Sequence, residues 1–165
     1  MSLFLSGCVQ LISRMHLQHI NILMENPNWK YQEQIRKFAD CPPSDYKPVD
    51  MIAFRWVFKD KSYRNNFLPP LAIDPSRKLK NDKLKCSGYA LSFFNSLENA
   101  KKRYLFLSDN NPQVFRSLGE YIARVEIKSD DGIASAPDIK GHFDLHEFAK
   151  ADLEHRFTWI CKAED

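Results

Sequence analysis

The clearest pattern in the chain is a series of short apolar runs and apolar–polar alternations in its middle and C-terminal parts. The β-branched and aromatic run at residues 51–58 (MIAFRWVF) predicts a buried strand, and residues 89–94 (YALSFF) predict a second one. Apolar residues alternate with polar ones over residues 121–127, and again over residues 157–161, which predicts a third strand and a closing strand. Asp131-Gly132 is typical of a turn between them.

Helix signals gather in the first forty residues. Apolar positions over residues 3–24 recur at roughly helical spacing, which favours an amphipathic helix or a helix followed by a short strand. Asn26 followed by Pro27 is typical of a helix start, with an Asn cap and a proline at the first helical position. We expect this helix to run to about Ala39, because the prolines at 42 and 43 disfavour the helical conformation just before them.

Two further helices are predicted after the second strand. Asn95 with Glu98 three residues later resembles a capping box, and Ser96 is an equally good cap; either one opens a helix to about Leu107. Asn111-Pro112 opens a shorter helix that Gly119 closes. Residues 60–86 show no regular period and read as irregular.

The order of these elements predicts an α+β fold. Helices come first and strands then mix with helices without a regular βαβ alternation, so we expect an N-terminal helical segment packed on a curved, mostly antiparallel sheet. A length of 165 residues suits a single domain over residues 1–165. Residues 1–24 would then be a peripheral helix, or an extension ahead of the true start at Met15 or Met24.

Composition narrows the class of protein only slightly. The net charge of +3, with acids and bases interleaved, is too small to indicate nucleic-acid binding by itself. No stretch approaches the ~20 apolar residues that span a bilayer, so no membrane association is expected. The four cysteines are widely spaced, which favours reduced, mostly buried thiols and a cytoplasmic location.

Arg55 and Ser92 are the first candidates for a binding site. Arg55 lies inside the most apolar strand, where a guanidinium needs an anionic partner or a cleft; it is either an anchor for phosphate or carboxylate, or part of an exposed strand face. Ser92 lies near the end of the second strand, where hydroxyls and backbone N–H groups can face a ligand.

The segment 141–147 (GHFDLHE) is the densest cluster of titratable side chains. In an extended segment His142, Asp144 and His146 share one face, and two imidazoles with a carboxylate are a known metal-ligand set. Three ligands from one flat strand rarely converge on one ion, so we predict a solvated polar face and no metal. The sequence contains no P-loop, no dinucleotide-binding glycine motif and no nucleophile elbow.

Part of the chain resembles a family of uncharacterised bacterial proteins. The shared pattern comprises Phe54-Arg55, the FLPP at 67–70, the P-x-R at 75–77, Cys86 and the GYALSFFNSLENA at 88–100. It covers about a third of the chain and implies no assigned activity.

The layout is also distantly similar to ADP-ribosyltransferases. In that superfamily an Arg on an early strand contacts NAD, a Ser-containing motif on a later strand precedes a helix, and a Glu completes the site. The resemblance implies that Arg55 holds the pyrophosphate and Ser92 orients the nicotinamide ribose, with Glu154 as the nearest match to the catalytic acid. The Ser-x-Ser triplet is replaced by Ser92-Phe93-Phe94, and no Glu-x-Glu precedes the last strand.

The leading hypothesis is therefore an NAD-using transferase or glycohydrolase of ADP-ribosyltransferase type. The alternative is a non-enzymatic interaction module that binds a protein or nucleic-acid partner through the basic segment 77–85 (RKLKNDKLK). The two hypotheses differ in one structural requirement. An NAD enzyme needs Arg55, Ser92 and a carboxylate in one cleft, whereas a binding module needs a contiguous apolar or basic surface.

Overall fold

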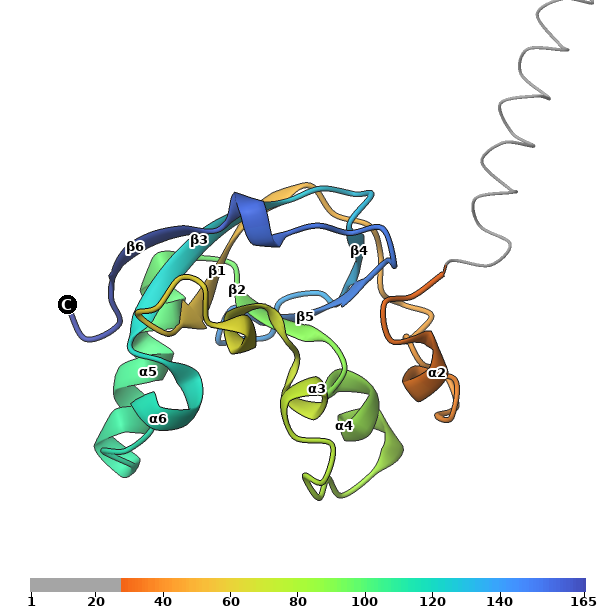
Figure 1. Cartoon of the computed structure of the whole chain (residues 1–165), viewed down its shortest axis with the longest axis horizontal. Helices are drawn as coiled ribbons and strands as arrows, with labels where there is room; N and C mark the ends of the chain where they lie inside the picture. The colour runs from red at the N-terminus through yellow and green to blue at the C-terminus, as the bar shows by residue number, and fades with distance from the viewer. Residues whose placement is uncertain (1–27) are drawn as a thin grey trace, which may run out of the picture.

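Six strands form one antiparallel sheet in the computed structural model, which describes residues 28–165 (Figure 1). The strand order across the sheet is β4-β5-β2-β1-β3-β6. The strands are β1 (Met51–Val57), β2 (Leu91–Phe94), β3 (Tyr121–Ile127), β4 (Gly132–Ala134), β5 (His142–Glu147) and β6 (Thr158–Lys162). The four strands predicted from the apolar runs and the alternation are confirmed as β1, β2, β3 and β6, and the fold is α+β. The expectations for residues 1–24 and for Asn26-Pro27 lie outside the described residues.

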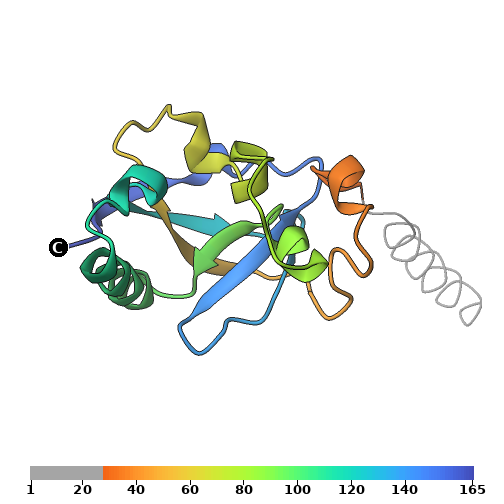
Figure 2. The same ribbon diagram turned by 90° about the horizontal axis from the view of Figure 1, so that it is seen from below.

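Helices fill the connections, and all of them except α5 are short. They are α2 (Gln32–Ile35), η1 (Arg64–Phe67), α3 (Pro70–Ile73), α4 (Asp82–Ser87), α5 (Leu97–Asn110), α6 (Phe115–Leu118) and η2 (Glu154–Arg156). Helices α3, α4, α5 and α6 lie on the same side of the sheet, below it in Figure 1 and nearer the viewer in Figure 2. The segment 60–86, predicted to be irregular, in fact carries three of these short helices. No helix of the described part is long and apolar enough to cross a bilayer.

The start of α5 is set by Ser96 and not by Asn95. The Ser96 hydroxyl accepts a hydrogen bond from the backbone N–H of Asn99 at 3.1 Å, which satisfies one free donor of the first turn. Gly119 closes α6 as predicted, because its φ of 81° is unfavourable for other residues and a Cβ there would lie 2.2 Å from the Val57 carbonyl oxygen. The Tyr104 hydroxyl, from α5, donates to the Gly119 carbonyl at 3.0 Å and ties the two helices together.

The helix predicted to reach Ala39 is wrong in its extent. Only α2 is α-helical, because tertiary pairing competes with the local helix preference. Trp29 forms an isolated antiparallel bridge with Phe148, and their rings stack at 5.0 Å. Asp40, at a φ of 52°, then turns the chain away before Cys41.

Both faces of the sheet are covered by apolar side chains. One buried cluster lies on the face that carries Phe93, Phe143 and Leu145, and it continues into β1 and β3 through Ala53 and Val125. A second cluster packs α5 against the other face and includes Phe94, Ala100, Tyr104 and Ile122. The strands β1 and β2 pair only at Phe54 and Phe94, so the sheet divides at this point, and the candidate site lies beside the division.

Candidate functional site: a basic groove

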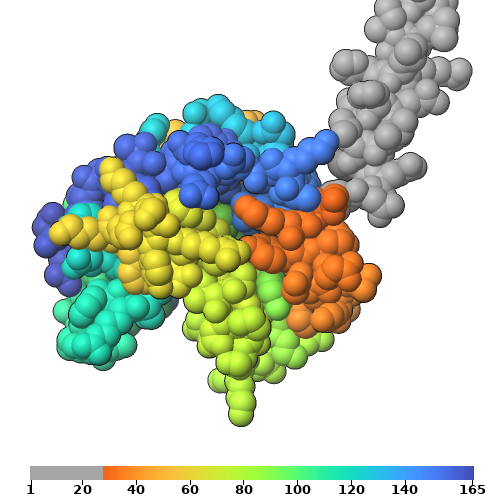
Figure 3. Space-filling model, viewed as in Figure 1, coloured from red at the N-terminus to blue at the C-terminus, as the bar shows by residue number. Residues whose placement is uncertain are grey.

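An open groove of about 900 Å³ lies on the helical side of the sheet. In Figure 3 the surface is hollowed between the part that carries α5 and α6 and the part that carries α3 and α4. We call this the basic groove. Its lining side chains come from β1, η1, α3, β2, α5, α6, β5 and the loops beside these elements: Arg55, Trp56, Phe58, Tyr63, Asn65, Leu68, Pro70, Ile73, Asp74, Arg77, Ser92, Phe94, Arg103, Leu107, Val114, Arg116, Ser117, Leu118, Asp138, Lys140 and His142.

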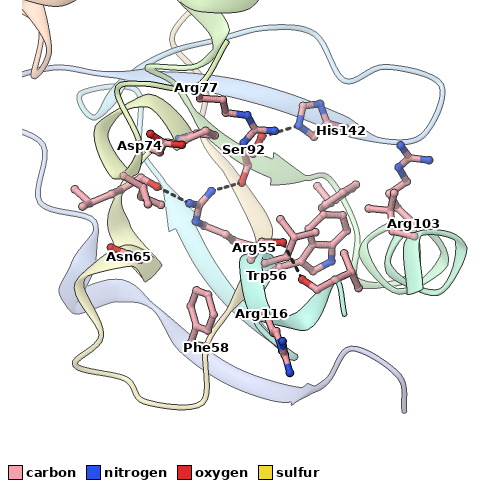
Figure 4. Close-up of a pocket in the computed structure, with 18 of the residues that line it drawn as sticks. Arg55, Trp56, Phe58, Asn65, Asp74, Arg77, Ser92, Arg103, Arg116 and His142 are labelled. Carbon is pink, nitrogen blue, oxygen red and sulfur yellow. Dashed lines mark hydrogen bonds between the residues drawn. The ribbon is translucent and has the colours of Figure 1, made fainter. Parts of the chain in front are cut away.

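The Arg55 side chain connects β1 to β2 at the place where their backbone pairing ends. Its Nη1 donates to the carbonyl of Ser92 at 2.8 Å, across the gap between β1 and β2 (Figure 4). Its Nε and Nη2 donate to the carbonyls of Asn66 at 3.0 Å and Leu68 at 2.9 Å. These acceptors satisfy a guanidinium that is only 9% exposed, so the alternative of an exposed strand face is wrong for Arg55.

The same contacts limit what Arg55 can offer a ligand. Burial lowers the pKa of Arg55 to about 10, so the side chain stays charged at neutral pH. Three of its five N–H groups are directed at backbone carbonyls, which leaves one N–H on each Nη for a molecule in the basic groove. Arg55 is thus first a structural support and only second a contact for an anion.

Ser92 and His142 form a hydrogen-bonded pair in the wall of the basic groove. The Ser92 Oγ lies 2.8 Å from the His142 Nε2 (Figure 4). Asp144 lies 3.9 Å from the same Nε2, whereas a carboxylate that orients a catalytic histidine contacts the opposite ring nitrogen. The Asp144 carboxylate instead accepts a hydrogen bond from the Ser87 hydroxyl at 2.5 Å, and burial raises its pKa. The geometry is that of a polar binding wall and does not match a serine-hydrolase triad.

Positive charge dominates the rest of the lining. Five cationic side chains line the basic groove together with two carboxylates, those of Asp74 and Asp138. Both carboxylates accept hydrogen bonds from backbone N–H groups of their own turns. Four of the cationic side chains have no carboxylate partner within the described residues: Arg77, Arg103, Arg116 and Lys140. Unpaired cations around a concave surface attract anionic ligands.

Aromatic rings complete the lining. The indole N–H of Trp56 donates to the Ala100 carbonyl at 3.1 Å, and its ring packs against Phe94 with the centroids 4.8 Å apart. Phe58 and Tyr63 meet edge to face at 4.9 Å near the η1 side. The groove therefore combines cationic with aromatic side chains, a combination that occurs in sites for nucleic acids.

The structure brings together two of the three predicted site residues. Arg55 and Ser92 line the same groove, while Glu154 lies exposed at the start of η2 and does not line it. Sequence reasoning missed Arg103, Arg116, Lys140 and Asp138. They stand on a helix, a short helical turn and a loop, and no spacing in the sequence connects them.

The polar face of β5 differs from the prediction. His142, Asp144 and His146 do share one face, because the alternate residues Phe143 and Leu145 lie in the core. However, that face is not solvated: Asp144 and His146 are buried, and each contacts a residue of α4.

The prediction of reduced thiols is also wrong for two cysteines, since Cys41 and Cys86 form a disulfide. Cys161 is free and half-buried, and Cys8 lies outside the described residues.

Comparison of the chain with protein-family models, with curated proteins and with solved structures finds no match.

Proposed function

We propose that the basic groove binds NAD and that the protein is an NAD-using transferase or glycohydrolase. The observation that carries the proposal is the convergence, in one groove of about 900 Å³, of Arg55 and Ser92 with four cationic side chains that have no carboxylate partner among residues 28–165. This volume is near the upper end for small-molecule sites, which suits an extended dinucleotide.

Each part of NAD has a complementary part of the groove. The pyrophosphate is matched by Arg77, Arg116 and Lys140, because guanidinium and ammonium groups form charge-assisted hydrogen bonds with phosphate oxygens. Ser92 and His142 offer a hydroxyl and an imidazole to a ribose. The rings of NAD can stack against the aromatic lining.

The reaction also needs a carboxylate that stabilises the oxocarbenium-like transition state as nicotinamide leaves. The resemblance to ADP-ribosyltransferases implies this role for Glu154, but Glu154 does not line the groove. Asp138 does, on the same loop as Lys140. Release of nicotinamide from NAD, compared between Glu154→Gln and Asp138→Asn, identifies the acid: the variant that loses turnover while retaining NAD binding carries it.

Thermal unfolding with and without millimolar NAD tests the binding step. NAD at 100-fold over its Kd stabilises the fold by about 2.7 kcal/mol, which raises the Tm of a chain of this size by several degrees. We expect the shift in the wild type and in Arg124→Gln, whose exposed side chain lies on β3 outside the groove. We expect it to shrink in Arg116→Gln and Arg77→Gln. Absence of a shift in the wild type would overturn the proposal.

A second candidate function, the binding of single-stranded nucleic acid, is favoured by side chains at the rim of the groove. Arg103 lies over the ring of Phe106 at 5.0 Å, and Arg116 lies over Phe115 at 5.9 Å. Phe106 and Phe115 are 57% and 41% exposed, so each pair presents a cation and an aromatic face to solvent. Such pairs are typical of surfaces that bind single-stranded nucleic acid. A fluorescence anisotropy titration with a labelled oligothymidine tests this function, and binding lost in Phe106→Ala but unaffected by NAD would favour it over the dinucleotide.

A further inference from the structure

Two cysteines and a histidine meet on the buried face of β5. Cys41 follows α2, Cys86 is on α4 and His146 is on β5. The two sulfurs and the nearer histidine nitrogen all lie within 4.8 Å of one another. None of the three residues lines the basic groove, so this cluster is separate from the proposed NAD site.

One spacing in the cluster matches a tetrahedral metal centre, while the two sulfurs are bonded to each other and must separate before both can bind an ion. Zinc binds thiolate sulfur at about 2.3 Å and imidazole nitrogen at about 2.0 Å, which places the two ligand atoms about 3.6 Å apart on a tetrahedron. The Cys86 Sγ and the His146 Nε2 are 3.6 Å apart. Two thiolates and one imidazole are also a donor set that selects zinc and related divalent ions over magnesium or calcium.

His146 is fixed in position beside the two sulfurs. Its side chain is only 2% exposed. Its Nε2 is directed at the Cys86 sulfur. The ring of Tyr46 lies against it with the centroids 5.9 Å apart, which covers the cluster from the side of the residue 43–50 loop.

We propose that Cys41, Cys86 and His146 form a zinc-binding site when the disulfide is reduced. Reduction adds two electrons and two protons to the Cys41–Cys86 bond and yields two thiols, while a dithiol reductant is oxidised to its own disulfide. Binding of the ion then releases two protons, one from each thiol. Water or an external ligand occupies the fourth coordination position.

The two states hold the same parts of the chain together by different bonds. The disulfide joins residues 45 positions apart. It attaches the segment that contains α2 to helix α4. In a reducing compartment the thiol form predominates, and a bound ion replaces the covalent link.

Cobalt titration of the full chain tests the site. The protein is reduced with a phosphine, which is oxidised to its phosphine oxide as water supplies the two protons, and Co²⁺ is then added without oxygen. We expect one Co²⁺ per chain, with the thiolate-to-cobalt charge-transfer absorption and the intense visible bands of a tetrahedral complex, and displacement by Zn²⁺. The oxidised protein should show neither absorption.

Three variants separate this site from adventitious binding by thiols. Cys41→Ser and His146→Gln should each weaken Co²⁺ binding more than tenfold, while Cys161→Ser, which removes the half-buried free thiol, should leave it unchanged. Circular dichroism confirms that each variant is folded. The proposal fails if reduced wild type binds no stoichiometric Co²⁺, or if His146→Gln binds Co²⁺ as tightly and with the same spectrum as the wild type.

Discussion

At the scale of single residues, Arg55 shows how far a physical argument from sequence can reach. A guanidinium inside an apolar strand needs a partner, and that requirement is visible in the sequence. The nature of the partner is not visible, because it depends on β1 and β2 diverging after Phe54. The structure supplies three backbone carbonyls, two of them from the segment 66–68.

Removing the Arg55 guanidinium should therefore destabilise the fold even without any ligand. Arg55→Met leaves three carbonyls without their charged donor, at a cost of about 3 kcal/mol. This should lower the Tm by roughly 10 °C for a chain of this length. Arg77→Met, at an exposed position in the basic groove, is the control and should change stability by no more than about 0.5 kcal/mol. Equal Tm values for Arg55→Met and wild type would show that the carbonyl contacts contribute nothing. The measurement is thermal unfolding by circular dichroism.

His146 predicts a loss of stability in acid. Its pKa is about 4 in the folded protein and near 6.5 when unfolded, so below pH 6.5 the unfolded chain binds a proton that the folded chain does not. Stability therefore falls as the pH drops from 6.5 to 4, by up to about 3 kcal/mol from this residue. Burial raises the pKa values of Asp144 and Glu147, which act in the opposite direction.

A comparison of wild type with His146→Gln isolates the histidine from those carboxylates. Urea unfolding at pH 6.5, 5.5 and 4.5 should show a steeper loss of stability in the wild type than in His146→Gln. Parallel pH profiles for the two proteins would contradict a buried, neutral His146.

At the scale of elements, local patterns succeeded where one element forms from its own residues. The apolar run located β1 and the alternation located β3, and the Ser96 cap and Gly119 mark the start of α5 and the end of α6. Local patterns failed where residues pair with a distant segment of the chain instead of with their neighbours. Trp29 pairs with Phe148 instead of entering a helix, and Cys41 bonds to Cys86 across 45 positions. Neither pairing leaves a periodic trace in the sequence.

The disulfide makes the strongest prediction at this scale. In the chain-entropy description, closing a loop of 45 residues stabilises the fold by about 4 kcal/mol. Reduction in the presence of a chelator should therefore lower the free energy of unfolding by up to that amount, measured by urea titration. Cys161→Ser should respond to reduction as the wild type does, because Cys161 is free. If Cys41→Ser loses stability on reduction by as much as the wild type, the loss does not come from this disulfide.

At the scale of the whole molecule, the basic groove is a product of the fold. Arg55 and Ser92 could be selected from the sequence because each lies in or beside a recognisable strand. Arg103, Arg116 and Lys140 could not, because they approach the same concave surface from α5, α6 and a loop. The net charge of +3 gave no hint of their concentration, since it averages over the entire chain.

Calorimetric titration of the full chain with NAD tests most directly whether the basic groove is an NAD site. The groove should bind one NAD per chain, and Arg77→Gln combined with Lys140→Gln should weaken binding about tenfold or more, since each phosphate contact from a cation contributes about 1 kcal/mol or more. Arg124→Gln should bind NAD as the wild type does. Absence of binding at millimolar NAD, or equal affinity in the wild type and the double variant, would contradict the assignment of the basic groove as a dinucleotide site.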